Sequence, residues 1–448
     1  MASTYLYRTS GTATLNTKMT FSIWAKRSLI SSSVALFSFS TDGSNELYFR
    51  FMDNDTLQVY SQKSGSKIIE RKTNRVFRDP SAWYHLILQI DTTQSTASDR
   101  VKFYVNGVQE TSFSAETNPS QNEAITYVSS ATFEIGRKTT STNLNFDGYM
   151  NHVAFVDGTA LTPSNFGETD TASGIWKWKS PSGVTWGDNG FHLKFDNDAN
   201  LGLDSSGETN NFTLGGNGKQ AKDNPTLSNT TYNALAQKYT SGTSYSNGNL
   251  TTTNTSGVGQ RMAISTFGVE TGKWYAEFKL VAIGSTSGSK PYVGVCSQRD
   301  YVGNTYVGAA PGCGLHTGGD IYYAGAGPTS TGTSYTTGDI IGVALDVTNS
   351  LIYWHKNGTY ISNGSGTGNP TTGANGFNFS TVTAKGGIVG FATSLFDNGG
   401  SWSANFGNGY FGTTKITSAG SNGNGSLFEY DVPSGYYALN TKNLNTYG

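Results

Sequence analysis

The sequence predicts an all-β chain built from two antiparallel β-sandwiches in tandem, and three observations lead to this fold class. First, glycine contributes 56 of the 448 residues and charged residues only 14%, a composition typical of short strands joined by many turns. Second, apolar and polar residues alternate with a period of two in short segments such as residues 20–25 and 274–280, which indicates half-buried strands. Third, one strand-and-turn unit occurs twice, in residues 83–107 and 338–358. Aromatic residues make up 13% of the chain, which argues against disorder.

The repeated unit has the features of a β-hairpin in both copies. An apolar strand ends on an aspartate, a loop follows, and a second, aromatic-rich strand then stops at Asn-Gly. Asn-Gly tolerates the left-handed backbone of a tight two-residue turn, so it marks a hairpin at residues 106–107 and again at 357–358. The two copies therefore predict two related sandwiches, a kind of domain that usually binds other molecules rather than transforming them.

Turn signals, polar segments and long loops divide the chain into four parts. Strands with turn signals every ~8–12 residues indicate a sandwich in two of these parts. The last part contains an aromatic stretch, residues 428–437, and we expect this tail to dock. The predicted parts are a first sandwich at residues 1–180, a connecting segment (part strand, part polar linker) at 181–250, a second sandwich at 251–407 and a docking tail at 408–448.

Composition and the N-terminal sequence exclude several classes of function. The formal net charge is −1 and the 30 Lys and Arg residues are scattered, so the basic patch of a nucleic-acid-binding protein is missing. No apolar run approaches the ~20 residues needed to span a bilayer, so we expect no membrane insertion. Residues 1–5 lack the charged and apolar regions of a signal peptide, so we expect synthesis in a cytoplasm without secretion. Cys296 and Cys313 do not make a disulfide framework.

Two sets of segments carry a family resemblance. Those of the first sandwich are residues 19–27, 83–91, 101–107 and 146–155. Through them, residues 1–180 resemble the laminin-G-like, concanavalin-A-like lectin/glucanase superfamily, whose fold is an antiparallel sandwich of the jelly-roll type. Those of the second sandwich are residues 272–278, 338–342, Asp346, 356–358 and 403–407. Through them, residues 251–407 resemble a SPRY domain, which is another concanavalin-A-like sandwich.

The order of these modules resembles that of virion structural proteins of tailed bacteriophages, and residues 160–168 and 433–441 add to the likeness. The resemblance implies a non-enzymatic tail fibre, tail appendage or capsid-surface protein that binds host-surface glycan or neighbouring virion subunits through its sandwich loops. It also implies a homo-oligomer, with a trimer as the usual fibre arrangement, and a location in the virion after assembly in the host cytoplasm. Tail-fibre and capsid-appendage roles both remain open.

Two other functions are alternatives: a glucanase-type carbohydrate-active enzyme, and a cellular SPRY adaptor that grips a peptide. Retaining glucanases of this superfamily carry Glu-x-Asp-x-x-Glu, with the two catalytic carboxylates ~5–5.5 Å apart. Residues 168–173 and 429–434 begin with Glu-x-Asp but lack the third carboxylate, so we expect turn or solvent-facing roles for them and no enzymatic activity. No signalling module accompanies the SPRY-like segment, which disfavours the adaptor.

Two kinds of residue are candidates for ligand binding. Tyrosines in the long loops of the second sandwich offer an apolar face and a hydroxyl, which suits sugars and protein partners, although they are alternatively packed beneath their own loops. Acidic pairs in turns offer oxygen ligands for calcium, the one candidate cofactor, with ordinary turn chemistry as the alternative. The five histidines show no metal-ligand spacing and are expected to be structural. The candidate tyrosines are Tyr301, Tyr306, Tyr322, Tyr323 and Tyr335, and the candidate metal ligands are Asp53, Asp55, Asp196 and Asp198.

Overall fold

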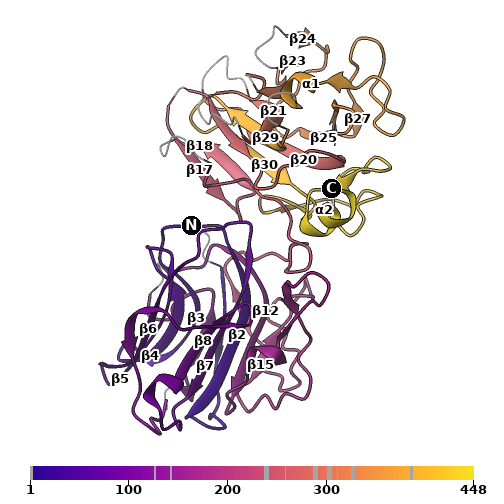
Figure 1. Cartoon of the computed structure of the whole chain (residues 1–448). Helices are drawn as coiled ribbons and strands as arrows, with labels where there is room; N and C mark the ends of the chain where they lie inside the picture. Colours follow the sequence, from indigo (N-terminus) through magenta and orange to yellow (C-terminus); the bar gives the residue numbers. More distant parts are fainter. Residues whose placement is uncertain are drawn as a thin grey trace. The chain divides into compact units, whose positions relative to one another are not determined.

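The backbone forms two compact units, each made of antiparallel sheets (Figure 1). Unit 1 comprises residues 1–220 and 224–226, and unit 2 comprises residues 221–223 and 227–448. The all-β class predicted from the sequence is confirmed. The structure, a computed structural model, describes residues 4–125, 128–141, 144–236, 242–257, 259–285, 291–299, 305–309, 311–323, 328–383 and 387–448.

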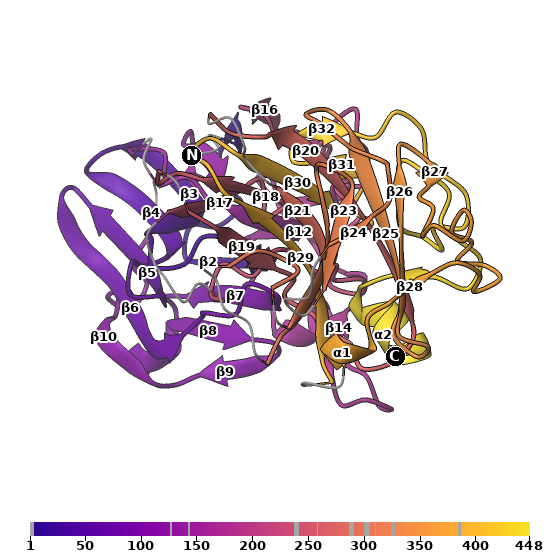
Figure 2. The same ribbon diagram turned by 90° about the horizontal axis from the view of Figure 1, so that it is seen from above.

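The larger sheet of unit 1 has eight antiparallel strands in the order β10-β6-β5-β4-β3-β11-β1-β16. Its strands are β1 (Tyr5–Thr9), β3 (Val34–Asp42), β4 (Asn45–Phe51), β5 (Thr56–Lys63), β6 (Ser66–Val76), β10 (Phe113–Thr117), β11 (Thr132–Ile135) and β16 (Thr213–Gly215). Strands β3 to β6 pair consecutively as hairpins, and Figure 2 shows β4, β5 and β6 leading to β10 at the sheet edge. This sheet supplies one wall of the core.

The smaller sheet of unit 1 has six antiparallel strands in the order β15-β12-β2-β7-β8-β9. Its strands are β2 (Lys18–Arg27), β7 (Trp83–Asp91), β8 (Val101–Val105), β9 (Val108–Glu110), β12 (Gly148–Asp157) and β15 (Phe191–Leu193). The inner face packs against the larger sheet, and the rings of Phe21 from β2 and Phe37 from β3 stack across the interface with centroids 4.3 Å apart. Because strand side chains alternate between faces, the neighbours of the core residues point to the outer face.

The outer face of the six-stranded sheet is covered by the chain between β12 and β15. This covering segment, residues 158–190, contains a 3₁₀ turn at Pro163–Asn165 and a two-stranded hairpin of β13 (Gly167–Thr169) and β14 (Trp176–Trp178). Phe166 of this segment packs on Ile87 of the sheet in an apolar cluster that is separate from the main core. Another 3₁₀ turn of unit 1 is Ala97–Asp99.

Unit 2 repeats the sandwich with a nine-stranded and a six-stranded sheet. The larger follows the order β17-β18-β30-β20-β25-β26-β27, with β28 beside β26 and β33 parallel to β20. Its strands are β17 (Thr243–Ser246), β18 (Thr251–Asn254), β20 (Lys273–Ala282), β25 (Ile340–Asp346), β26 (Leu351–Lys356), β27 (Thr359–Tyr360), β28 (Phe377–Asn378), β30 (Ser401–Asn405) and β33 (Tyr437–Ala438). The rings of Phe278 from β20 and Phe391 from the opposite sheet lie 6.1 Å apart in the core.

The smaller sheet of unit 2 follows the order β19-β29-β21-β22-β23-β24. Its strands are β19 (Arg261–Ile264), β21 (Tyr292–Ser297), β22 (Gly312–His316), β23 (Asp320–Tyr323), β24 (Thr329–Ser330) and β29 (Val389–Leu395). The other elements of unit 2 are the hairpin of β31 (Tyr410–Phe411) and β32 (Thr414–Lys415) and the helices α1 (Ser380–Thr383) and α2 (Thr441–Tyr447).

The C-terminal tail lies on the outer face of the nine-stranded sheet. Phe428, Val432 and Tyr436 of the tail are buried together with Tyr275 of β20 and Tyr353 of β26, in a cluster separate from the core between the sheets. The aromatic side chains of the tail thereby cover an apolar sheet face that would otherwise contact water.

The two copies of the repeated unit form hairpins with the same turn geometry, as predicted. Asn106 and Asn357 both have a φ of 49°, and the glycines that follow have φ of 81° and 87°. Each asparagine also bonds to the first strand of its repeated unit. The Oδ1 of Asn106 accepts the backbone N–H of His85 in β7, and that of Asn357 accepts the N–H of Ile340 in β25, both at 2.8 Å. The side-chain amide therefore adds to the backbone preference that made Asn-Gly a hairpin signal.

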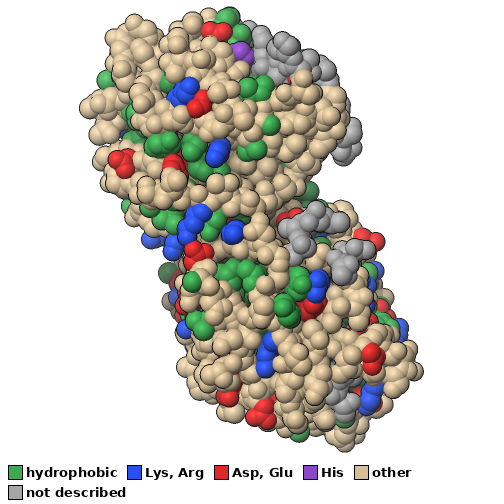
Figure 3. All heavy atoms as spheres, turned by 180° about the vertical axis from the view of Figure 1, so that it is seen from behind, with side chains coloured by type: hydrophobic (Ala, Val, Ile, Leu, Met, Phe, Trp, Pro, Cys, Tyr) green, Lys and Arg blue, Asp and Glu red, His purple; other side chains and the backbone are tan. Residues whose placement is uncertain are grey.

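The surface agrees with the charge distribution of the sequence. On the face drawn in Figure 3, basic and acidic side chains are interspersed and neither sign forms a continuous patch. Within the described ranges, no helix is long and apolar enough to cross a membrane.

Candidate functional site

The outer face of the six-stranded sheet in unit 1 gathers tryptophan and histidine side chains from strands that are distant in sequence. On β2, Phe21 and Ile23 belong to the core, so Ser22 and Trp24 point to the outer face. The same alternation brings histidines to this face from three further strands: His85 on β7, His152 on β12 and His192 on β15.

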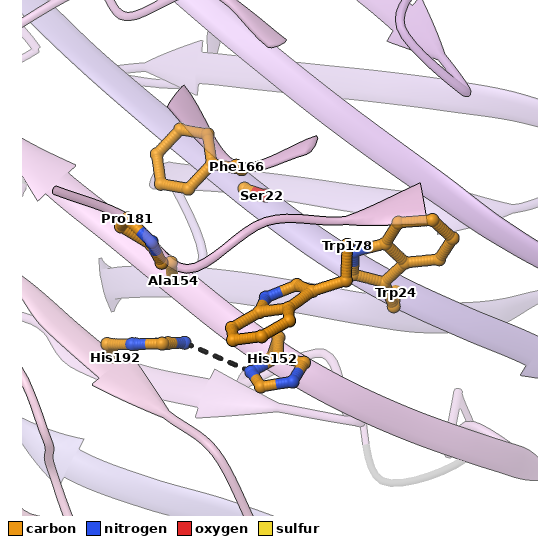
Figure 4. A pocket seen from close by; sticks show the side chains of 8 residues that line it. All are labelled: Ser22, Trp24, His152, Ala154, Phe166, Trp178, Pro181 and His192. Carbon is orange, nitrogen blue, oxygen red and sulfur yellow. Dashed lines mark hydrogen bonds between the residues drawn. The ribbon is translucent and has the colours of Figure 1, made fainter. Parts of the chain in front are cut away.

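A shallow pocket lies between this face and the covering segment. Its empty volume is about 160 Å³, which includes open solvent. The pocket is too narrow to admit a water molecule. None of its lining side chains is an acid, a lysine or an arginine. The lining residues, drawn in Figure 4, are Ser22, Trp24, His152, Ala154, Phe166, Trp178, Pro181 and His192.

His85 lies beside the pocket, and its hydrogen bonds fix its tautomer. Trp176 of β14 donates its Nε1–H to His85 Nδ1 at 2.8 Å, and an indole nitrogen is only ever a donor. The proton of the neutral imidazole is therefore on Nε2, which donates to Ser22 Oγ at 2.9 Å. Trp24 stacks on the same imidazole, with ring centroids 4.7 Å apart and an interplanar angle of 6°. This network fixes the covering hairpin to β7 and β2.

His152 is held in a strained position at the centre of the pocket. Its φ is 45°, and it lies where β12 shifts register against β2, between Asn151 and Ala154. Such bulges re-aim side chains and are common beside functional sites. The imidazole stacks under Trp178, with centroids 4.0 Å apart, and its Nδ1 lies 3.3 Å from Nε2 of His192 (Figure 4).

All three imidazoles are neutral at ordinary pH. Burial, with smaller contributions from nearby histidine and lysine charges, lowers the pKa of His85 and of His152 from 6.5 to about 3. Burial also lowers the pKa of His192 to about 4. The face therefore offers flat, uncharged rings of indole and imidazole, a surface suited to stacking rather than to attracting ions.

The candidate tyrosines are brought together only in part. Tyr306 and Tyr322 meet on the outer face of the six-stranded sheet of unit 2, with ring centroids 5.9 Å apart, and Tyr292 packs against both. Tyr323 belongs to the opposite face of β23 and packs against the core. Tyr335 is only 4% exposed, and its hydroxyl donates to backbone carbonyls, so it packs beneath its own loop. Tyr301 lies outside the described residues.

The candidate calcium ligands take different roles. Asp55 is buried and contacts Arg27 at 3.1 Å and Arg78 at 2.9 Å, so its carboxylate is committed to two ion pairs. Asp53 is exposed in the same turn. Asp196 and Asp198 are also exposed. Within the described residues, no three His, Cys, Asp or Glu side chains are grouped so that they could hold a metal ion.

The two Glu-x-Asp segments have local structural roles. Glu168 and Asp170 of the β13–β14 hairpin both contact Lys177, at 3.4 and 3.1 Å. Hydrogen bonds from Ser173 and Lys177 lower the pKa of Asp170 to about 2, so it keeps no proton to donate near neutral pH. Glu429 accepts hydrogen bonds from Thr417.

The sequence did not predict the pocket of tryptophans and histidines. The spacing of Trp176 and Trp178 was a usable signal, since the two indoles share one face of a strand. The histidines gave a weaker signal because they come from strands whose pairing the sequence does not state. His85 and His192 are buried, and His152 is half-buried.

The comparisons with known proteins concern the fold. Residues 2–165 match the family model of the concanavalin A-like lectin/glucanases superfamily. This match covers less than half of the chain and agrees with the laminin-G-like resemblance of the first sandwich. A search of curated proteins gave no match.

Several solved structures are similar to parts of the chain. The SPRY domain of human HERC1 is 19% identical, with 35% of this chain and 87% of that chain covered and a TM-score of 0.27. A heptameric SAP-like pentraxin from Limulus polyphemus is 17% identical, with 41% and 82% covered and a TM-score of 0.30. A putative carbohydrate binding protein from Bacteroides ovatus is 18% identical, with 48% and 57% covered and a TM-score of 0.31.

Proposed function

We propose that the protein is a non-enzymatic binding protein of a virion surface, which attaches to host-surface glycan or to neighbouring virion subunits through its sandwiches. The single observation that carries the binding role is the pocket of stacked tryptophans and neutral histidines in unit 1. Ser22, Trp24, His152 and Ala154 of this pocket lie in residues 2–165, which match the concanavalin A-like lectin/glucanases model, and the other lining residues follow that segment.

The chemistry of the pocket suits sugars. Pyranose rings have apolar faces that pack on indoles, and their hydroxyl groups exchange hydrogen bonds with a few well-placed polar atoms. Trp178 is half-buried, so part of its ring is available at the surface. A single shallow site of this kind binds weakly, and useful attachment then requires several copies in one particle.

The absence of catalysis is supported by the roles of the acidic residues. Glu168 and Asp170 share Lys177 on the covering hairpin, and Asp170 has too low a pKa to act as a general acid at neutral pH. Glu429 is engaged with Thr417. A glucanase mechanism needs one carboxyl group that retains its proton, and the low pKa of Asp170 unfits it for that role.

The virion location and the homo-oligomer, with a trimer as the expected form, rest on the resemblance of the module order to virion structural proteins. In this proposal the Tyr306–Tyr322 pair of unit 2 is a second contact surface, toward glycan or another virion protein. Labelling of intact particles with an antibody against the chain tests the location. Labelled tails or capsids support it, and the absence of label from intact and disrupted particles refutes it.

The binding role is tested by a glycan array with the full chain, together with an assay for reducing ends released from host polysaccharide. We expect selective binding without hydrolysis. Trp178→Ala is expected to reduce binding by about tenfold or more, because it removes the stacking face. Tyr7→Ala, which removes a 40% exposed aromatic of unit 1 outside the pocket, is the matched control and is expected to bind normally. Release of reducing ends that is abolished by Glu168→Gln would establish the glucanase alternative instead.

A further inference from the structure

Trp24 carries a buried hydrogen-bond donor that has no partner. Its side chain is only 3% exposed and lines the pocket, and its Nε1 bonds to no acceptor among the described residues. Buried polar groups in native proteins are nearly always satisfied, and an exception calls for an explanation. In Figure 4 the nitrogen-bearing edge of the indole faces the other lining side chains. The pocket therefore presents a donor that awaits an acceptor.

Ser22 supplies a second donor to the same pocket. Its Oγ accepts from His85 Nε2, because Trp176 fixes the proton of His85 on that nitrogen. The hydroxyl proton of Ser22 is then available to an acceptor in the pocket. Ser22 and Trp24 lie on the same face of β2, one pleat apart. Two neighbouring donors match the two lone pairs of a single carbonyl oxygen.

The rest of the pocket is apolar or uncharged. Ala154, Phe166 and Pro181 form one side, and Trp178 provides an indole face. The neutral histidines give no electrostatic preference for an anion. An occupant that suits this lining has a carbonyl oxygen, a planar centre and a small apolar end.

We propose that the pocket is the seat of the acetamido group of an N-acetylated sugar, whose carbonyl oxygen accepts from Trp24 Nε1 and Ser22 Oγ. The amide plane stacks on an indole face and the methyl group contacts Ala154 and Phe166. This inference rests on the glycan-binding role proposed above and narrows it to one class of sugar. A plain hydroxyl fits less well, because it brings a proton of its own to a site that already offers two donors.

Entry of the group requires Trp178 to move. The pocket is narrow while the Trp178 indole lies against His152 (Figure 4). Trp178 belongs to a two-stranded hairpin whose strands pair with no other strand in the described part of the chain. Movement of the Trp178 side chain therefore breaks no ladder of either main sheet, and the bond of Trp176 to His85 keeps the hairpin in place. The indole then closes over the bound group.

The test is a titration of the full-length protein with the methyl glycosides of N-acetylglucosamine and of glucose, followed by saturation-transfer NMR and calorimetry. The two sugars differ only in the acetamido group. We expect the N-acetylated sugar to bind about tenfold more tightly, which corresponds to one hydrogen bond to a buried donor. The acetyl methyl protons are expected to receive the strongest saturation.

Trp24→Phe keeps an aromatic ring and removes the N–H, so it is expected to abolish the preference for the N-acetylated sugar. Trp402→Phe makes the same change in the core of unit 2 and is expected to keep the preference. Ser22→Ala is the second variant, with a partial loss expected, and circular dichroism establishes that each variant is folded.

The outcomes separate the inference from the proposed function. Equal affinity for the two sugars, or a preference that survives in both Trp24→Phe and Ser22→Ala, overturns the acetamido assignment. If an array then shows binding to other glycans, the binding role stands without it. If the array shows no glycan bound at all, the proposed function falls as well.

Discussion

The two units use the repeated hairpin in the same way but treat the sheet face beside it differently. In both, a lysine at the start of one strand contacts the aspartate that ends its neighbour: Lys18 and Asp91 at 3.3 Å in unit 1, Lys273 and Asp346 at 3.2 Å in unit 2. In both, a buried histidine on the outer face contacts a later segment of the chain: His85 contacts Trp176, and His355 contacts Tyr430.

The difference lies in what covers that histidine. In unit 1, the later segment contacts His85 through one indole, that of Trp176, and the pocket beside it remains. In unit 2, Gly358 N–H donates to His355 Nδ1, so the proton is on Nε2, which donates to Tyr275. The Tyr275 hydroxyl in turn donates to Glu277, at the place in β20 that Ser22 has in β2.

Glu277 then binds the C-terminal tail to the outer face of the nine-stranded sheet. Its two carboxylate oxygens accept the backbone N–H groups of Glu429 and Tyr430, both at 2.8 Å. The comparison teaches that one scaffold gives a sealed face or a face with a narrow pocket. The outcome depends on whether the later segment covers the face with its backbone and several aromatics or with one hairpin.

The largest expected effect comes from weakening the seal of unit 2. Phe428 is 1% exposed and packs edge-on against Tyr275, with centroids 4.9 Å apart. Phe428→Ala is expected to lower the free energy of unfolding of unit 2 by about 3–5 kcal/mol, the usual cost of emptying such a site. Peptide-resolved hydrogen exchange measures this, with unit 1 as the internal control. A change below about 1 kcal/mol would show that the tail merely rests on the sheet.

Glu277 on the face of unit 2 is expected to respond to pH with the sign opposite to that of the buried histidines on both faces. Burial raises the pKa of Glu277 from 4.5 to about 7, so its folded form holds a proton more tightly than the unfolded form. Its contribution is fully present below pH 4.5 and is lost as the pH rises through 7, by about 3 kcal/mol in total. His85 and His152 have lowered pKa values, so unit 1 loses stability as the pH falls from 6.5 toward 3.

Hydrogen exchange at a series of pH values checks this pair of trends. Glu277→Gln has nearly the same shape but does not titrate, and it is expected to remove most of the slope of unit 2 between pH 6.5 and 8, above the range in which the lowered pKa of His355 contributes. An identical slope in the variant would mean that Glu277 is not the titrating group. Unit 1 is unchanged by this variant and serves as its control.

A smaller and more selective effect is expected at the hairpin turns. A Cβ on Gly107 would lie 2.6 Å from the Trp176 ring, and one on Gly358 would lie 2.9 Å from Tyr430. Both glycines have positive φ, so alanine at either site is expected to cost about 1–3 kcal/mol. Gly107→Ala alone is also expected to weaken glycan binding, because it displaces the covering hairpin. Equal losses of binding in both variants would contradict the assignment of the site to unit 1.

The smallest effect is expected at the shared lysine–aspartate contacts. The side chains of Lys18 and Lys273 are each 33% exposed, and ion pairs near solvent contribute little. Lys18→Met and Lys273→Met are each expected to change stability by less than about 1 kcal/mol in chemical denaturation. A loss well above this value in either unit would make the contact a stabilising feature of the scaffold.

The sequence predicted those features of the fold that depend on residues adjacent in the chain, namely strands and turns. Period-two alternation gave strands such as β20, and Asn-Gly gave the turns at 106–107 and 357–358 because backbone preference decides them locally. The site depends on strand order instead. His152 and His192 meet because β12 pairs with β15, and nothing in the sequence states that pairing.

The role of Asp55 was also not predicted, because it depends on contacts between residues that are distant in sequence. The sequence showed an acidic turn, but the ion pairs of Asp55 come from Arg27, which lies on another strand, and from Arg78. Tyr335 likewise looked available as part of a loop, and is buried because carbonyl groups of other segments accept from its hydroxyl. Contacts with distant segments determine whether such residues are buried or paired, and the alternation of apolar and polar residues does not predict those contacts.

The most direct test of the central claim, that unit 1 keeps a ligand pocket where unit 2 is sealed, is an NMR titration of the indole N–H signals. The chain has eight tryptophans, and Trp24→Phe identifies the signal of Trp24. Addition of the N-acetylglucosamine glycoside is predicted to shift the signals of Trp24 and Trp178 and to leave those of Trp274, Trp354 and Trp402 in unit 2 unchanged. Shifts confined to the tryptophans of unit 2 would contradict the account.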